Sequence, residues 1–402
     1  MKFNKSGQLL LVSAASLLVA GLVTACGTLT VDFVFVACSK AAGANNYGEL
    51  DVFEVNSESG YMRQIPTSPF PSGGRDPVAE AVSSDNADLY VVNQDDNSIV
   101  QFIIGNDGKL YPQNTVNTPG IYPLAVAVNG SNLFVLDTYE PLPTCSTAAP
   151  CSGSIAVFPI RAASGTTPSG ELGTPVANGS LNYWALSLPG KPNDVLLPTG
   201  ITVLASGADV YVSAYDTTAN IGYVFGFAAT SGGSLTPLNG GVPFAAGTYP
   251  SAIASDPSSS FVYVTDSSTG KVLGYSVQSG SLSPLSGSPY QAGNQPTSLA
   301  VDSSGKYLYV ANGEDSTVTA YSIASGVLTS LGSYTTGLQP VAIGIDPSTN
   351  HFVYTANYLG GNVSGFQLNP NDGSLLNTQN SPYAANPQPV AIAAIPHGSQ
   401  KK

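Results

Sequence analysis

A short segment that begins with proline occurs seven times in this chain. Each copy continues into small and β-branched residues, a composition typical of β-strands. The copies begin at Pro77, Pro123, Pro198, Pro250, Pro296, Pro340 and Pro389. Successive prolines are 46, 75, 52, 46, 44 and 49 residues apart, which is the period of a β-propeller blade with one long insertion. A unit of this size cannot bury its faces alone, so we expect all seven copies to stack into one ring.

The copy that starts at Pro296 shows the complete unit. Turn residues separate its four strand-like runs, which are 296–301, 307–311, 318–323 and 328–334. The chain ends complete the pattern, because 33–66 supplies the second to fourth strands of a blade and 389–394 supplies a first strand. We therefore predict an all-β, seven-bladed propeller with four antiparallel strands per blade. Its two ends share one blade, which removes exposed sheet edges.

Residues 1–25 have the features of an export signal. Lys2 and Lys5 precede an apolar run from Leu9 to Val23, and small residues precede Cys26. The sequence around Cys26 resembles the lipobox of bacterial lipoproteins. That resemblance implies a lipid on Cys26 and a membrane-anchored, extracytoplasmic protein, with the outer membrane or its periplasmic face favoured. A signal peptide without lipid attachment is the alternative.

These features divide the chain into four parts, which are a signal peptide (1–25), a short tether (26–32), one propeller domain (33–396) and a tail (397–402). Removal of the signal peptide moves the formal net charge from −13 to −15, because it contains two lysines and no acid. Nucleic acid is excluded as an expected partner, since phosphate binding needs clustered Lys and Arg.

Cys145 and Cys151 lie six residues apart in a turn-rich segment of a chain with an export signal. That context favours a local disulfide. A zinc site is the alternative, but no histidine lies nearby and two ligands are too few. Cys38 is then an odd thiol at the end of a strand, where we expect it to act as a small buried side chain.

Two sets of loops are expected to share the rim of the channel mouth, namely those that enter the first strand and those that follow the second. Acids outnumber cations in these loops, so we expect the rim to attract cations, amines, neutral glycans or a protein partner. The candidate binding residues on it are Asn93, Asp137, Tyr139, Tyr215, Asp266, Asn312, Glu314, Asn357 and Tyr358.

Five of these residues are Asn or Asp at the end of the second strand: Asn93, Asp137, Asp266, Asn312 and Asn357. Their oxygens could form a ring of ligands for a calcium-like ion. Alternatively, each side chain bonds its own loop backbone and ends the strand, which the regular recurrence favours. We therefore expect no cofactor, with Ca²⁺ as the alternative.

Neither histidine is placed for catalysis at the rim. His351 falls in the turn between the first and second strands, on the opposite face, and His397 follows the last strand. A general base must reach its substrate, so histidine chemistry at the rim is not expected. No nucleophile elbow, zinc-protease motif or phosphate-binding glycine loop is present.

Residues 296–312 and 340–366 resemble the seven-bladed lactonase family, which includes bacterial 6-phosphogluconolactonases, and Tyr263 to Asp266 resembles a related surface-layer repeat. In the family's enzymes, Arg-His follows the proline of a central blade and Asn-Glu ends its second strand. None of the seven prolines here is followed by Arg or His, and Gly313 displaces Glu314 from Asn312. The resemblance therefore implies the fold more directly than the chemistry.

We accordingly expect a lipid-anchored, extracytoplasmic propeller that binds a ligand through an acidic rim without catalysis. One alternative is a lactonase-like hydrolase that opens an uncharged lactone, with Asp137 or Glu314 as the base. Another is a calcium-dependent, gluconolactonase-like enzyme. The insertion at 139–197 in the third blade is either a specificity element or a solvated elaboration.

Overall fold

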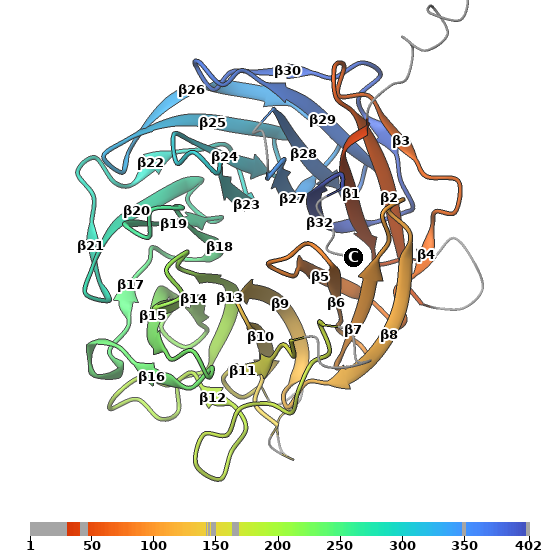
Figure 1. The fold of residues 1–402 in the computed structure, drawn as a ribbon. Coiled ribbons are helices and arrows are strands. Elements are labelled where there is room, and N and C mark those ends of the chain that lie inside the picture. The colour runs from red at the N-terminus through yellow and green to blue at the C-terminus, as the bar shows by residue number, and fades with distance from the viewer. Residues whose placement is uncertain are drawn as a thin grey trace, which may run out of the picture.

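The computed structural model describes residues 30–40, 47–141, 143, 145, 150–162, 169–347 and 351–398. Seven small antiparallel sheets surround a central axis, and the innermost strands of all seven lie around one channel (Figure 1). Within the described residues, the other regular element is the short 3-10 helix η1 (Asn239–Gly241). The predicted seven-bladed propeller is confirmed.

Six blades are continuous in sequence, and we name each after its innermost strand. From the channel outward, the β5 blade consists of β5 (Pro77–Val82), β6 (Asp88–Asn93), β7 (Ser98–Ile104) and β8 (Leu110–Asn117), and the β9 blade of β9 (Ile121–Asn129), β10 (Asn132–Tyr139), β11 (Ser154–Pro159) and β12 (Trp184–Ala185). The β13 blade consists of β13 (Leu196–Val203), β14 (Asp209–Asp216), β15 (Ile221–Ala229) and β16 (Leu235–Pro237), and the β18 blade of β18 (Pro250–Ser255), β19 (Phe261–Asp266), β20 (Lys271–Gln278) and β21 (Ser281–Pro284). The β23 blade consists of β23 (Pro296–Val301), β24 (Tyr307–Asn312), β25 (Thr317–Ala324) and β26 (Val327–Thr335), and the β27 blade of β27 (Pro340–Ile345), β28 (Phe352–Asn357), β29 (Asn362–Leu368) and β30 (Leu375–Asn377). Three short strands pair with the third strand of their blade: β17 (Phe244–Ala245), β22 (Tyr290–Gln291) and β31 (Tyr383–Ala384).

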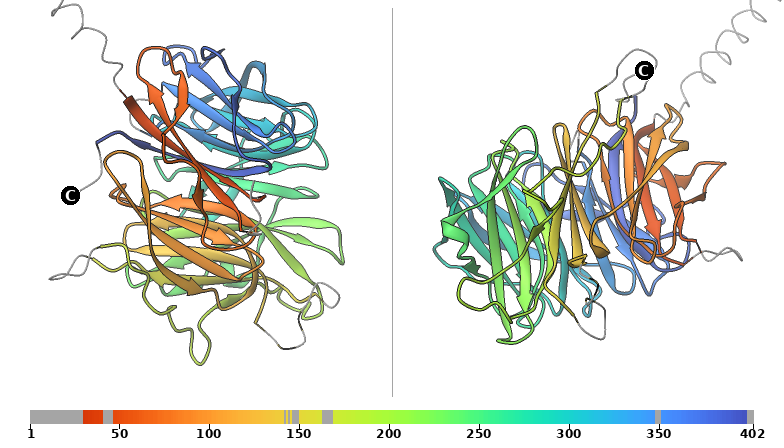
Figure 2. Two further views of the ribbon diagram at one scale, coloured as in Figure 1. Left: turned by 90° about the vertical axis from the view of Figure 1, so that its right-hand side faces the viewer. Right: turned by 90° about the horizontal axis from the view of Figure 1, so that it is seen from below.

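The seventh blade contains both ends of the propeller, and we call it the closing blade. Its innermost strand β32 (Pro389–Pro396) pairs with β1 (Thr30–Cys38), followed outward by β2 (Glu49–Asn56) and β3 (Met62–Gln64), while β4 (Phe70–Pro71) also pairs with β2. Figure 1 and Figure 2 show β1 and β32 together on one side of the ring. The predicted closure is confirmed, and pairing of Asp32 with Pro396 extends it beyond the predicted ends.

Each repeat proline lies beside the same irregularity in its innermost strand. In the β23 blade, Pro296 is paired with Asn312 and Ser298 with Ala311, so the residue between them bulges out of the ladder. The same one-residue shift after the proline occurs in the other six blades. Proline lacks an amide donor, so it is tolerated at a strand start or beside a bulge.

The hydrophobic core lies between neighbouring blades. For example, Tyr309 and Ala311 of the β23 blade pack with Ile343 and Val353 of the β27 blade. Tyrosine hydroxyls also join the blades: Tyr90, Tyr211, Tyr263 and Tyr309 are buried on second strands and donate to glycine carbonyls of the next blade at 2.8 to 3.1 Å. Buried tyrosine needs such a partner, so each bond also fixes the angle between two blades.

Candidate functional site

Five Asn or Asp side chains lie at or near the mouth-side end of the second strand, and all are buried: Asn93, Asp137, Asp266, Asn312 and Asn357. Asp137 accepts a hydrogen bond from the Gly120 amide at 3.0 Å. Asp266 accepts one from the Thr248 amide at 2.8 Å. In both cases the donor lies in the loop that leads into the innermost strand of the same blade. These side chains therefore fasten a loop to its own blade, and we call their positions the clasp positions.

The clasp is made differently in the other blades. Asn312 accepts from the Gly293 amide at 3.0 Å, and Asn93 donates to a loop carbonyl at 3.4 Å. Cys38 pairs with Pro389 and so occupies the clasp position of the closing blade. In this blade the buried Asp51 binds the loop instead, because it accepts a hydrogen bond from the Asn386 amide at 2.6 Å. The Cys38 thiol lies 3.7 Å from Oδ2 of Asp51.

Loop bonding is the second of the two interpretations given above for these residues. Among the residues that the structure describes, no three or more His, Cys, Asp or Glu side chains are grouped so that they could hold a metal ion. The donors to Asp266 and Asn312 are backbone amides and hydroxyls, which can satisfy oxygen atoms without a cation. Asn93 Oδ1 and Asp137 Oδ1 have no hydrogen-bond partner among the described residues, and Asn357 bonds the Asn362 and Ser364 side chains of its own blade. The clasp positions thus have a structural role in this fold.

The two candidate bases, Asp137 and Glu314, do not share a site. Asp137 lies on the buried strand β10 of the β9 blade, whereas Glu314 is exposed in the loop that follows β24 of the β23 blade. Two blades lie between them on the shorter path around the ring. Burial raises the pKa of Asp137 to about 7, against the hydrogen bonds from Thr118 and Gly120. Asp137 has no exposed surface from which to reach a substrate.

The candidate tyrosines lie in two pairs at the mouth. Tyr215 packs against Tyr249 with ring centroids 4.6 Å apart, and Tyr139 meets Tyr122 edge-on at 6.3 Å. Tyr249 is 43% exposed. The half-buried Tyr358 donates its amide to the Gln339 carbonyl at 2.8 Å. The partners of these tyrosines, Tyr122, Tyr249 and Gln339, each directly precede a repeat proline.

Seven residues directly precede the repeat prolines, and we call them the mouth ring: Asp76, Tyr122, Leu197, Tyr249, Gln295, Gln339 and Gln388. They lie at or just before the mouth-side ends of the innermost strands and so encircle the channel (Figure 1). Five of them have a left-handed backbone, with φ between 50° and 60°. Such a backbone is rare outside glycine, and here it turns each loop into its strand. Sequence reasoning missed this set, although aligning the seven prolines would have identified it.

Asp76 is the one carboxylate in the mouth ring. It is half-buried, and within the described residues its side chain accepts no hydrogen bond. Burial raises the pKa of Asp76, and the charge of the neighbouring Asp95 raises it further. The adjacent Arg75 does not neutralise it, because its guanidinium binds Asp96 through Nε at 2.7 Å. Asp76 is thus a carboxylate at the mouth with free acceptor capacity.

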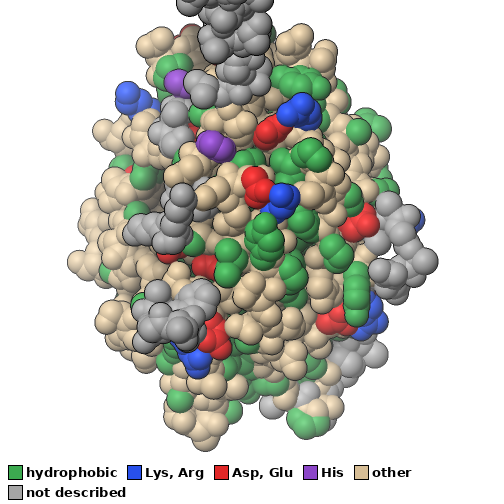
Figure 3. Space-filling view, turned by 45° about the vertical axis from the view of Figure 1, so that its right-hand side comes forward, with side chains coloured by type: hydrophobic (Ala, Val, Ile, Leu, Met, Phe, Trp, Pro, Cys, Tyr) green, Lys and Arg blue, Asp and Glu red, His purple; other side chains and the backbone are tan. Residues whose placement is uncertain are grey.

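Two cations near the mouth are already paired, whereas Lys271 at the start of β20 makes no ion pair among the described residues. Besides the bond between Arg75 and Asp96, Lys191 lies 3.4 Å from Asp194. Figure 3 shows the molecule from the side that carries the histidines, away from the mouth, and there too charged side chains are sparse and most blue ones touch red ones. A phosphate or carboxylate would therefore have to compete with acidic side chains for these cations.

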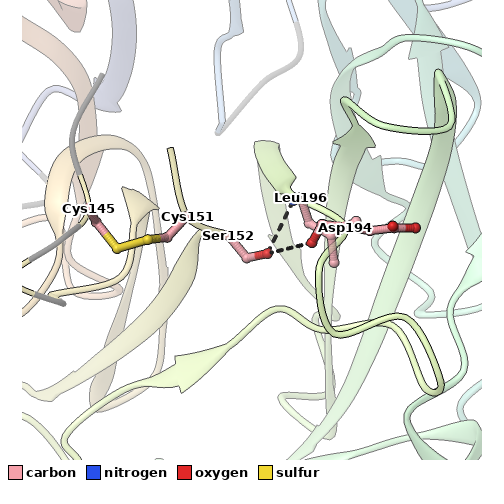
Figure 4. Close-up of a disulfide and its surroundings, with 5 residues drawn as sticks. All are labelled: Cys145, Cys151, Ser152, Asp194 and Leu196. Atoms are coloured by element: carbon pink, nitrogen blue, oxygen red, sulfur yellow. Dashed lines mark hydrogen bonds between the residues drawn. A yellow bond between two sulfur atoms is a disulfide. The ribbon is translucent and has the colours of Figure 1, made fainter. Parts of the chain in front are cut away.

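The insertion in the β9 blade is fastened beside the mouth. Cys145 and Cys151 form a disulfide, and Ser152 donates to the Asp194 carbonyl and accepts from the Leu196 amide (Figure 4). The loop after β10 is thereby tied to the start of the β13 blade. Trp184 is 4% exposed and packs in the core between these two blades. Part of the insertion therefore forms β12, the outermost strand of the β9 blade.

The expected signal peptide, the lipid site Cys26 and most of the tether lie outside the described residues. None of the helices that the structure describes has the length and apolar character needed to cross a bilayer.

Comparison with known proteins agrees with this architecture. The family model described as "Lactonase, 7-bladed beta-propeller" matches residues 209–326 and 279–397. Among curated protein sequences, none matches this chain.

Solved structures share the fold at low sequence identity. A candidate 6-phosphogluconolactonase from Bacteroides fragilis is 19% identical with a TM-score of 0.68, over 91% of this chain and 98% of that one. A periplasmic gluconolactonase from Pseudomonas aeruginosa is 19% identical with a TM-score of 0.64, over 91% and 99%. AztD from Citrobacter koseri is 12% identical with a TM-score of 0.56, over 93% and 100%. Over residues 209–397 the chain thus matches the model of the seven-bladed β-propeller lactonase family, and its ring of seven four-stranded blades is the fold of that family.

Proposed function

We propose that the protein is a hydrolase that opens an uncharged lactone at the channel mouth, with Asp76 as the general base. The observation that carries this proposal is the position of Asp76, the one carboxylate in the mouth ring and one without a hydrogen-bond donor among the described residues. Its raised pKa suits a base, because proton transfer is most efficient when the pKa approaches the working pH. The match to a lactonase family model supports the reaction class.

The proposed reaction needs only a base and hydrogen-bond donors. Asp76 accepts a proton from a water molecule whose oxygen attacks the lactone carbonyl. The ring C–O bond then breaks, and the alkoxide leaving group takes the proton back, so the product is a hydroxy acid. The amides of Gln295, Gln339 and Gln388 belong to the same ring and could donate hydrogen bonds to the carbonyl oxygen as negative charge develops there.

The chemistry of the mouth ring supports an uncharged substrate. Its members apart from Asp76 are tyrosines, glutamines and a leucine, which suit a ligand with hydroxyl groups and an apolar ring face. The nearby Arg75 and Lys191 are each paired with an aspartate. A phosphorylated lactone would thus find both of these cations already bound to carboxylates.

A binding module without catalysis is the second candidate. It is favoured by the absence of Arg or His after all seven repeat prolines, where the family's enzymes place catalytic residues. In that case the mouth ring would bind the same class of uncharged ligand and leave it intact. Direct binding without turnover distinguishes this function from the hydrolase.

Export is part of the same proposal. The signal features of residues 1–25 and the disulfide between Cys145 and Cys151 both suit an oxidising, extracytoplasmic compartment. The similar Pseudomonas aeruginosa protein is periplasmic. A lipid on Cys26 would attach the propeller to a membrane, and Cys26→Ser should then release the protein into the soluble periplasmic fraction.

Activity on a lactone panel tests the hydrolase. Purified mature protein is assayed on glucono-δ-lactone, a γ-lactone and a phosphorylated sugar lactone, and we expect turnover of the uncharged compounds. Asp76→Asn should lower kcat by about 100-fold or more, as loss of a general base does. Glu314→Gln, which also removes one carboxylate near the mouth, is the matched control and should leave kcat unchanged. Equal rates for wild type and Asp76→Asn would reject Asp76 as the base, and absence of turnover would leave the binding module.

A further inference from the structure

One residue breaks the repeat inside the innermost strands. The third residue after each repeat proline is Glu80, Val126, Ile201, Ile253, Leu299, Ile343 or Ile392. These seven are structurally equivalent, because each pairs with the residue two positions before the clasp position of its blade. Six blades therefore place a branched aliphatic side chain where the β5 blade places a carboxylic acid.

The aliphatic members of this set fill the seams between blades. Ile343 packs in the core shared with the preceding blade, and Leu299 does the same one blade earlier. The preceding neighbour of β5 is β32, so Glu80 lies where the closing blade meets the first continuous blade. Both Glu80 oxygens are buried and have no hydrogen-bond partner among the described residues. An ionised carboxylate in such a place is costly, whereas the neutral acid is tolerated.

Three groups surround Glu80. The Ala393 amide of β32 lies near its carboxyl group, and the buried Cys38 thiol of β1 lies within electrostatic reach, with Asp51 of β2 behind it. No cation is among the groups that act on Glu80 in the part of the chain that the structure describes. Burial raises the pKa of Glu80 to about 8, and the Ala393 amide opposes this rise.

The other side of the closing blade also contains a buried acid. Asp32 of β1 is fully buried and accepts a hydrogen bond from the Tyr354 hydroxyl of β28 at 3.2 Å. In four other blades the equivalent tyrosine donates to a glycine carbonyl instead. The buried Asp346 carboxyl faces Asp32, and burial together with Asp346 raises the pKa of Asp32 to about 8.

Two histidines complete the titratable surroundings of this second seam. The His351 amide donates to Asp346 at 3.3 Å, and the His397 ring packs on Phe33 with centroids 5.3 Å apart. Neither imidazole is among the groups that act on the Asp32 carboxyl, which are Asp346 and Tyr354. The second seam thus resembles the first, because a neutral acid fills a buried position.

We propose that the closing blade is held on both sides by carboxylic acids in their neutral form, so that rising pH loosens this blade more than the β23 blade, which has an aliphatic side chain at the position of Glu80. The inference does not rest on the proposed hydrolase. The inference does concern the mouth, because Asp76 and Gln388 lie at the mouth-side ends of β5 and β32. These two strands meet at the seam that contains Glu80. Opening this seam would move these two mouth residues apart.

The sign of the effect follows from proton linkage. The ordinary pKa of Glu80 is 4.5 and the folded value is about 8, so the folded state retains a proton that the opened state releases. The stabilisation is complete below pH 4.5 and is lost as pH rises through about 8. Between these limits, the opening equilibrium of the seam should rise about tenfold per pH unit for each such group.

Amide hydrogen exchange of the full-length mature protein tests the proposal. Exchange of β32 and β1 is compared with that of β24 at pH 6 and pH 8.5, after correction for the intrinsic rate. In the wild type, protection of β32 should fall at least tenfold relative to β24. In Glu80→Ile, which introduces the residue type of the equivalent positions, most of that fall should disappear, and Glu80→Gln should behave similarly. Asp32→Asn should reduce the fall in β1.

Glu314→Gln is the control and should change nothing, because this carboxylate is exposed. The proposal is overturned if β32 and β24 lose protection in parallel in the wild type, a result that requires no variant to fold. It is also overturned if a folded Glu80→Ile protein keeps the full pH dependence of β32. Neither outcome depends on whether the protein hydrolyses a lactone.

Discussion

The clasp positions and the mouth ring are adjacent layers of the propeller, yet they differ in how strictly they repeat. Five of the seven clasp positions are Asn or Asp, and their side chains are buried against loops. The mouth ring contains four residue types in equivalent places and keeps them half-buried or exposed. Positions that repeat around a ring serve the blade, whereas positions that vary are free to serve a ligand. Each prediction below tests this division.

Loss of a clasp should have the largest effect. Asp266→Ala removes a buried acceptor that binds the Thr248 and Tyr249 amides. We expect a loss of about 2–3 kcal/mol in the free energy of unfolding, as for other hydrogen bonds to a charged group. Urea denaturation followed by circular dichroism measures this change, and a loss under 0.5 kcal/mol would contradict a structural role for the clasp.

Neutralising a clasp should have a smaller effect of opposite sign. The pKa of Asp137 is raised from 3.8 to about 7, so its contribution to stability is complete below pH 3.8 and is lost as pH rises through 7. Asp137→Asn, the residue that three other blades use, should raise the melting temperature at pH 8 and leave it nearly unchanged at pH 4. A drop in melting temperature at pH 8 would show that the ionised form is needed.

Removal of one inter-blade hydroxyl should cost less than loss of a clasp. Tyr309→Phe deletes the donor to the Gly373 carbonyl but keeps the ring, and Phe134 shows that phenylalanine fits the equivalent place. We expect a destabilisation of about 1 kcal/mol. Tyr334→Phe, at a partly exposed position, is the matched control and should be neutral by the same denaturation measurement.

Change in the mouth ring should hardly affect stability. Gln339→Ala removes a half-buried side chain that makes no hydrogen bond among the described residues. We expect the free energy of unfolding to change by less than about 0.5 kcal/mol, while KM for an uncharged lactone rises. A large destabilisation with unchanged KM would place Gln339 with the clasp residues and remove the distinction between the two layers.

The sequence predicted the fold well because short patterns of neighbouring residues define each repeat. Proline, alternating apolar residues and turn residues recur in each blade, so the four strands and the closure by 33–66 and 389–394 could be read directly. The pairing of Cys145 with Cys151 likewise followed from six residues of spacing.

The candidate site was harder to predict because it depends on which side chains are buried. Asp137 and Glu314 look alike in sequence, but one is enclosed by its own loop and the other is exposed three blades away. Asp76 and Glu80 were passed over because they sit inside the repeat that identified the scaffold. Comparing equivalent positions across the seven copies would have singled out both, since the departures from a repeat mark the places where a blade does something different.

The direction of β1 has a consequence for how the propeller can present itself. Thr30 lies at the end of β1 that is remote from the mouth, and the strand then runs toward Cys38 beside the mouth-side end of β32. The chain therefore enters the ring from the rear. If a short segment before Thr30 is fixed to a surface, the rear of the ring faces that surface, and the mouth opens toward whatever diffuses past it.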